Sequence, residues 1–103
     1  MPRQPETEAQ RQLVAELQQA MTPLRDLSVV RLALFGSQAR GDAQPDSDVD
    51  VLVGFAATPT LQVYLAVVDW LEQTLRRRVD VVMKGALKPR VRAAVERDSI
   101  RVA

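Results

Sequence analysis

Four aspartates lie within nine residues, in the stretch DAQPDSDVD at positions 42–50. Asp48 and Asp50 stand two residues apart and lead into the apolar run VLVGF. On a strand such residues face the same side, with Cα atoms roughly 6.5–7 Å apart. At an effective dielectric of about 20, two carboxylates about 6 Å apart repel by roughly 3 kcal/mol. A turn at PDSD accounts for Asp46 and Asp48 as caps of backbone amides. It leaves Asp50 unexplained. Taken alone, such a pair on a strand is more often structural or solvated than catalytic, and a site where a cation offsets the repulsion is the alternative.

A third carboxylate, Asp80, stands between valines in RRVDVVM, one predicted helix later. A strand interior disfavours Asp, so two strands depart from the same rule. If these strands are neighbours, Asp48, Asp50 and Asp80 converge on one spot. Mg²⁺ takes oxygen ligands of this kind and completes its shell with substrate phosphates. Two such ions about 3.5–4 Å apart can hold the attacking and leaving oxygens of an in-line phosphoryl transfer.

Gly36 and Ser37 directly follow the apolar run VVRLALF. Glycine after a buried strand permits a tight turn and a close approach of the backbone to a ligand. If residues 37–40 begin a short helix, their amides and the Ser37 hydroxyl form an anion site. The alternative is an ordinary strand-end turn with Ser37 as N-cap, and the carboxylate pair downstream favours the anion site. Arg40 and Gly41 either extend that site or end the short helix.

The elements that position these residues follow from hydrophobic spacing and from turn residues. We expect a helix over about 6–22, strands over 29–35, 48–55 and 79–83, a helix from Thr58-Pro59 to about Arg77, a helix over 87–97, and extended chain over 99–102. This order predicts an α/β (α+β) fold, in which helices cover a small mixed sheet of three to four strands.

The composition limits the classes of protein to which this chain can belong. With 103 residues, 47% of them hydrophobic, residues 1–103 are predicted to form a single domain. No apolar run approaches the roughly 20 residues of a membrane span, and the polar start MPRQPETEAQ lacks the apolar core of a signal peptide. The absence of cysteine excludes disulfides and fits a cytoplasmic location. The absence of histidine removes the commonest general base.

Charge is unevenly distributed, although the net charge is only +1. No Lys or Arg occurs over 41–75, whereas nine basic residues occur over 76–101. A solvated face is the simpler interpretation, and a basic surface for a triphosphate, RNA or an acidic partner is the alternative. Within this region Arg76–Arg78 are expected to be a solvated helix end, from which one arginine could reach a triphosphate. Tyr64 and Trp70 are expected to serve packing instead of base stacking.

The stretch GSQARGDAQPDSDVD resembles the G-S-x10-D-x-D signature of the nucleotidyltransferases of the DNA polymerase beta superfamily. Its flanks, ALFGSQARG and SDVDVLV, resemble the minimal nucleotidyltransferase (MNT) family within it. The third carboxylate of this family, in an apolar-Asp-apolar strand, matches Asp80. The C-terminal LKPRVRAAVERDSIRV is also similar to the end of these proteins, so the resemblance covers roughly residues 28–102.

The resemblance implies a polymerase-beta-like nucleotidyltransferase fold and transfer of AMP from ATP to a hydroxyl group, with release of pyrophosphate. The site residues that it implies are catalytic and metal-binding Asp48, Asp50 and Asp80, which hold two Mg²⁺ ions, and nucleotide-binding Gly36, Ser37 and Arg40. Asp80 is the implied acceptor of the hydroxyl proton. MNT proteins are typically paired with HEPN-domain toxins and add AMP to a tyrosine of the toxin. The resemblance therefore implies an antitoxin in a hetero-oligomer with a HEPN toxin, without direct binding to nucleic acid or membranes.

Two other functions stay open. A binding antitoxin would neutralise its toxin by contact alone, and its nucleotidyltransferase site would be idle. The retention of strained carboxylates argues against an idle site. A small-molecule nucleotidyltransferase of the aminoglycoside-modifying type is the other alternative, although such enzymes carry an additional substrate domain that is not seen in these 103 residues.

Overall fold

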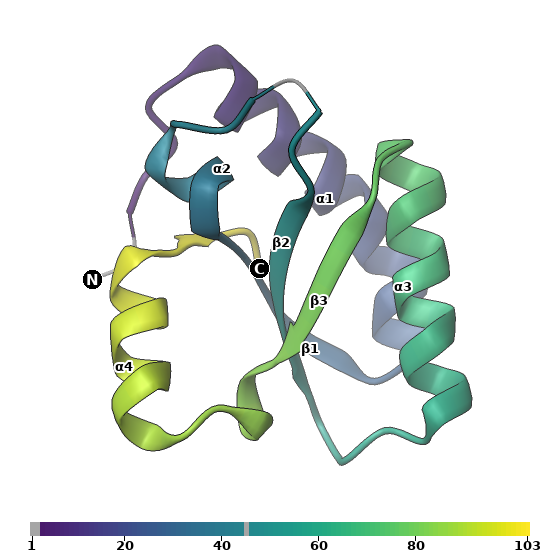
Figure 1. Ribbon diagram of the computed structural model, residues 1–103. Helices are drawn as coiled ribbons and strands as arrows, with labels where there is room; N and C mark the ends of the chain where they lie inside the picture. The colour runs from purple at the N-terminus through teal and green to yellow at the C-terminus, as the bar shows by residue number, and fades with distance from the viewer. Residues whose placement is uncertain (1–2, 45) are drawn as a thin grey trace.

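The computed structural model of the protein describes residues 3–44 and 46–103, and Figure 1 shows how helices surround a twisted sheet. In chain order the elements are α1 (Glu8–Asp26), β1 (Val29–Phe35), α2 (Gly36–Arg40), β2 (Val49–Phe55), α3 (Leu61–Leu75), β3 (Val79–Met83), the 3₁₀ turn η1 (Lys84–Ala86), α4 (Pro89–Asp98) and β4 (Ile100–Arg101). Within the described residues, no helix combines the length and the apolar character that crossing a bilayer requires.

The sheet is mixed, as the sequence predicts. Its strand order is β3-β2-β1-β4. β1 pairs antiparallel with both β2 and β4, whereas β2 pairs parallel with β3. A parallel pair needs a crossover connection, and α3 supplies it between β2 and β3. The predicted mixed α/β fold is therefore confirmed, with four strands among the described residues.

The hydrophobic core lies between one face of the sheet and the helices α1 and α3 (Figure 1). Leu17 and Leu24 of α1, Val51 of β2 and Leu71 of α3 are fully buried there. Because side chains alternate along a strand, the apolar valines of β2 face this core while Asp50 faces the opposite, open side of the sheet. That side carries Asp50 and also the apolar side chain of Leu52.

Aromatic residues of α3 serve packing, as predicted. Tyr64 and Trp70 pack against the core. The Tyr64 hydroxyl donates a hydrogen bond of 2.9 Å to the carbonyl oxygen of Val81, and Trp70 Nε1 donates one of 3.1 Å to the carbonyl oxygen of Ala20. Both polar tips are therefore satisfied inside the fold.

Several predicted boundaries are wrong by a few residues. α3 begins at Leu61, since the hydroxyl of Thr60, and not Thr58-Pro59, caps it by accepting from Val63 N. It ends at Leu75, because Arg76 adopts a left-handed conformation. The first helix continues to Asp26 instead of ending near residue 22, because Leu24 in its last turn is buried in the core.

Two further boundaries differ. β2 begins at Val49, one residue later than predicted, and Asp48 precedes it. The last helix begins at Pro89, two residues later than predicted. Proline suits the first helical position because it has no N–H to leave unpaired.

A buried glutamine joins the start of α1 to α2. Gln10 Nε2 donates to the carbonyl oxygens of Gln38 and Ala39 at 3.0 and 3.2 Å. Its Oε1 accepts from the backbone N–H groups of Glu6 and Thr7. One side chain therefore completes the cap of α1 and fixes the position of the short helix that follows β1.

Replacement of Gln10 tests this anchor. Gln10→Ala removes four hydrogen bonds, and the carbonyl oxygen of Ala39 keeps only its bond from Arg3 Nη1. We therefore expect it to lower the free energy of unfolding by about 1–3 kcal/mol. Gln12→Ala, at an exposed position of the same helix, is the matched control and should change it by less than about 0.5 kcal/mol. Urea denaturation measures both. Equal effects of the two substitutions would show that Gln10 is no anchor.

Candidate active site

Asp50 and Asp80 are direct neighbours across the parallel pair of strands. The register pairs Asp50 with Asp80, between the pairs Val49–Val79 and Val51–Val81. Side chains of paired residues share a face of the sheet, so both carboxylates point to the open side while the valines point to the core. The structure therefore brings together the two carboxylates that the sequence places thirty residues apart.

The electrostatics of Asp50 show that Asp48 belongs to the same group. Burial raises the pKa of the half-buried Asp50 carboxyl above its usual range. The negative charge of Asp80, and then that of Asp48, raise this pKa further. Asp48 is exposed and lies just before β2. Asp48 and Asp80 thus both lie close enough for their charges to act on Asp50.

Gly36 and Ser37 form the turn between β1 and α2, beside Asp50. Gly36 has φ +68°, which favours glycine. A Cβ atom at this position would overlap Oδ2 of Asp50. The absence of a side chain therefore lets the backbone of the turn lie against the carboxylate. Ser37, in the first turn of α2, is half-buried at the same place.

Arg40 is the last residue of α2, and Gly41 ends the helix with φ +82°. The Arg40 Nε lies 3.3 Å from Oδ2 of Asp42, and both side chains are exposed. The positive charge of Arg40 also lowers the pKa of Asp50. Gly41 therefore ends the helix, while the charge of Arg40 reaches the carboxylate group.

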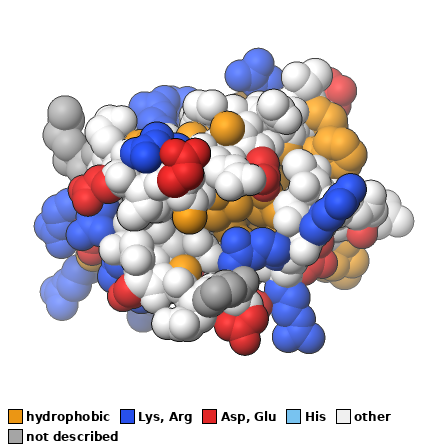
Figure 2. All heavy atoms as spheres, turned by 90° about the horizontal axis from the view of Figure 1, so that it is seen from above, with side chains coloured by type: hydrophobic (Ala, Val, Ile, Leu, Met, Phe, Trp, Pro, Cys, Tyr) orange, Lys and Arg blue, Asp and Glu red, His pale blue; other side chains and the backbone are white. Residues whose placement is uncertain are grey.

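The remaining aspartates of the motif lie outside this group, as the turn interpretation of Asp46 predicts. Asp42 and Asp46 are exposed in the connection between α2 and β2. Figure 2 shows the end of the molecule that is at the top of Figure 1. Acidic and basic side chains lie there on either side of a strip of hydrophobic surface.

Arg77 is a residue whose role the sequence does not reveal. It was expected in a solvated helix end, and Arg76 and Arg78 are indeed exposed. Arg77, however, is half-buried, and its Nη2 donates a hydrogen bond of 2.8 Å to the carbonyl oxygen of Ser47. It therefore ties the segment before β3 to the residue that precedes Asp48. Three consecutive arginines give no signal for which one turns inward.

The acidic residues fit Mg²⁺ by their chemistry. Within residues 3–44 and 46–103, no three acidic side chains are clustered tightly enough to form a ready-made metal cage. Mg²⁺ does not require one, because it uses one or two carboxylates and takes further oxygens from substrate phosphates and water. Three carboxylates that repel one another, without a histidine in the chain, are a donor set for a hard cation.

One face of the mixed sheet is covered by the core, the other carries Asp50 beside Asp80, and the Gly36 turn lies against Asp50. Residues 14–102 match the nucleotidyltransferase domain family, and the chain belongs to that family. The resemblance to MNT proteins is thereby confirmed, and the chain is an enzyme of the nucleotidyltransferase class.

Three known proteins illustrate the likeness. The protein adenylyltransferase MntA of Thermococcus cleftensis is 42% identical over 80 residues, which cover 77% of this chain and 81% of that protein. A solved structure of a minimal nucleotidyltransferase has a TM-score of 0.78 at 36% identity and covers 92% of this chain and 97% of its own. The third is a chain from the complex of a tri-AMPylated Shewanella oneidensis HEPN toxin with its MNT antitoxin. It has a TM-score of 0.62 at 18% identity, covers 91% of this chain and 71% of its own, and shows the same fold.

The close approach of Gly36 to Asp50 can be tested by adding one methyl group. Gly36→Ala combines a left-handed φ with an overlap, so we expect a loss of about 1–3 kcal/mol in the free energy of unfolding. Gly85→Ala is the control, because a Cβ there meets nothing within 4 Å. The double variant Gly36→Ala/Asp50→Ala should recover part of the loss in urea denaturation. Strictly additive effects of the two substitutions would contradict the contact.

The raised pKa of Asp50 predicts how stability depends on pH. Because the fold disfavours the charged carboxylate, the native state holds this proton more tightly than the unfolded state does. As the pH rises through the acidic range where the carboxyl ionises, the wild type loses stability relative to Asp50→Asn. At neutral pH we therefore expect Asp50→Asn to be more stable than the wild type.

Thermal unfolding at about pH 7 and about pH 4 measures this difference, which should shrink at the lower pH as the wild-type carboxyl takes up its proton. Asp46→Asn, at an exposed turn position, is the matched control and should show no comparable gain. A variant Asp50→Asn that is less stable than the wild type at neutral pH would refute the electrostatic interpretation.

Proposed function

We propose that the protein transfers AMP from ATP to a tyrosine hydroxyl of a HEPN-family toxin in a Mg²⁺-dependent reaction, and that it acts as the antitoxin of that toxin. The observation that carries the proposal is the register that sets Asp50 beside Asp80, with the Gly36 turn against Asp50. The adenylyltransferase name of the 42% identical relative supports AMP as the transferred group. The fold shared with a HEPN–MNT complex supports the class of partner.

The binding end of the proposed site is the turn between β1 and α2. Gly36 and Ser37 hold the outer phosphates of ATP there, because a backbone without a side chain lets phosphate oxygens approach its amides. Arg40 adds a positive charge next to the carboxylates. The triphosphate is thereby oriented before the reaction, which removes an entropic part of the barrier.

The proposed chemical step is an in-line displacement. The acceptor oxygen forms a bond to the α-phosphorus, the bond between that phosphorus and the oxygen bridging to the β-phosphorus breaks, and pyrophosphate leaves. The hydroxyl proton passes to Asp80, which is exposed and lies on the edge strand β3, where a partner's hydroxyl can reach it. Mg²⁺ bound by Asp48, Asp50 and Asp80 would neutralise charge on the phosphates.

The activity test uses the wild-type protein, ATP, Mg²⁺ and the product of the neighbouring gene, which the proposal predicts to be a HEPN-family protein. We expect the mass of that protein to rise by whole AMP units. Asp48→Asn, Asp50→Asn and Asp80→Asn should each lower the rate at least about 100-fold, because each removes a charge that faces the reacting phosphates. Asp46→Asn should keep the rate within about twofold, since its side chain is exposed in the turn.

Two results would overturn this proposal. The first is no gain of mass with the wild type, although the two proteins form a stable complex. The second is protection of cells from the toxin by the double variant Asp48→Ala/Asp50→Ala at the wild-type level. That second result would favour a binding antitoxin, which needs contact and no chemistry.

A further inference from the structure

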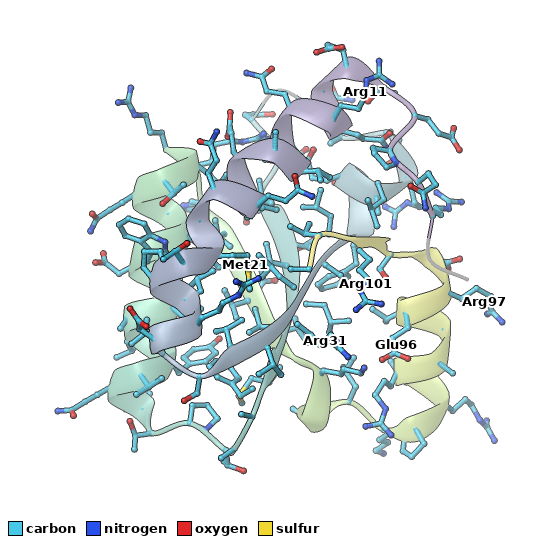
Figure 3. All side chains as sticks on the ribbon, turned by 180° about the vertical axis from the view of Figure 1, so that it is seen from behind. Arg11, Met21, Arg31, Glu96, Arg97 and Arg101 are labelled. Carbon is cyan, nitrogen blue, oxygen red and sulfur yellow. The ribbon has the colours of Figure 1, made fainter. Side chains whose placement is uncertain are left out.

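Beyond the carboxylates, the open face of the sheet ends in a basic pocket. A cavity of about 420 Å³ lies there between β1, β2 and the helix α4. Its charged lining residues, which define the basic pocket, are Arg31, Lys84, Glu96, Arg97 and Arg101. Figure 3 shows Arg31, Arg101 and Glu96 gathered between the sheet and α4, whereas Arg97 points outward.

The charges of the basic pocket do not cancel. Lys84 Nζ lies 2.6 Å from Oε1 of Glu96, so this lysine is paired with the single acidic residue of the lining. Across residues 3–44 and 46–103, neither Arg31 nor Arg101 takes part in an ion pair. Two guanidinium groups therefore line the cavity without an ion-pair partner among the described residues.

The sheet itself sets these two arginines on the face of Asp50. Arg31 pairs with Gly54, and Arg101 pairs with Ala33, two residues along β1 from Arg31. A Cβ on Gly54 would lie 3.0 Å from Cβ of Arg31, so the glycine leaves room for the arginine side chain. The register thus makes the pocket a continuation of the carboxylate site.

Size and chemistry favour a nucleotide as the occupant. The volume lies within the range of about 300–1,000 Å³ that is usual for small-molecule sites, and an acidic side chain would fill only a small part of it. Leu52 and Ala33 give the pocket an apolar floor that suits a base. The planar fork of arginine matches phosphate oxygens in pairs. A nucleotide suits the volume of the cavity, its base suits the apolar floor, and its phosphate suits the arginine side chains.

The pocket lies on the acceptor's side of the reaction, given the proposed function. The register along β1 places Phe35 at Asp50, Ala33 at Leu52 and Arg31 at Gly54, so the pocket extends away from the Gly36 turn. In an in-line displacement the nucleophile approaches opposite the leaving pyrophosphate. A group carried by the acceptor is therefore directed toward the pocket.

We propose that the basic pocket binds the 5′-phosphate of a second nucleotide, distinct from the ATP donor, and that this nucleotide is an AMP unit already attached to the acceptor. The inference rests on the proposed transfer of AMP. Free AMP carries the same phosphate group, and the transfer test distinguishes free AMP from an AMP unit attached to the acceptor.

The binding test titrates the full-length protein with AMP, and with adenosine as the uncharged comparison, by isothermal calorimetry and amide NMR. We expect AMP to shift the amides of Ala33, Leu52 and Gly54 and to bind at least about 10-fold more tightly than adenosine. Arg31→Gln and Arg101→Gln should each weaken AMP at least about 10-fold, and Arg101→Lys should weaken it less.

Two further variants sharpen this test. Glu96→Gln should tighten AMP several-fold, because it removes the one acidic side chain of the lining, an effect that a merely structural role would not produce. Arg11→Gln is the matched control, since Arg11 lies on α1 away from the pocket (Figure 3). Unchanged AMP affinity in both Arg31→Gln and Arg101→Gln would overturn the proposal.

The transfer test counts AMP units on the acceptor by intact mass. If the pocket receives an attached AMP, Arg31→Gln and Arg101→Gln leave the KM for ATP and the rate of the first transfer unchanged. The fraction of acceptor molecules that carry two or more AMP units falls at least about 10-fold. An unchanged distribution, together with weakened AMP binding, supports free AMP as the source of the phosphate. A 10-fold rise in the KM for ATP overturns the proposal, because the pocket then holds the donor. If the wild type transfers no AMP, the proposed function is rejected. The binding test then still shows whether the basic pocket binds AMP.

Discussion

The parallel pairing of β2 with β3 holds like charges together, and the rest of the fold maintains this pairing. Val49 and Val51 on one strand and Val79 and Val81 on the other face the core, so a one-residue slip would bury Asp50 and expose the valines. The crossover helix α3 supplies the far side of that core. Burial of the valines thus offsets the repulsion between the carboxylates, and under the proposed function a bound cation would relieve that repulsion.

Two glycines adapt the backbone to this polar face. At Gly36 the absence of Cβ lets the turn before α2 touch the Asp50 carboxylate, and at Gly54 it gives space to the Arg31 side chain. The first lies at the proposed phosphate site and the second at the basic pocket. Under the two proposals, the face runs from a cation site to an anion pocket, which would suit a reaction between a donor and an acceptor that both carry phosphate.

Contacts from distant segments hold the site at its edges. Gln10 connects α1 to α2, and Arg77 connects the start of β3 to the residue before Asp48. At the other edge, the backbone N–H of Val102 donates to the carbonyl oxygen of Leu32, so β4 brings Arg101 beside β1. None of these anchors touches the proposed reacting atoms, and each one limits how far a catalytic element can move.

The amino-acid sequence by itself determined the strands over 29–35 and 79–83, the mixed α/β class and the spacing of the carboxylate motif, because alternation and apolar runs are local signals. It placed the start of α3 wrongly, since Thr58-Pro59 is a local signal for a helix start, whereas the folded chain places the cap at Thr60. Tertiary structure alone decided that Asp50 faces Asp80, that Arg77 turns inward, and that Arg31 and Arg101 share a pocket. These relations join residues far apart in the chain, and they depend on strand order and register, which local spacing does not encode.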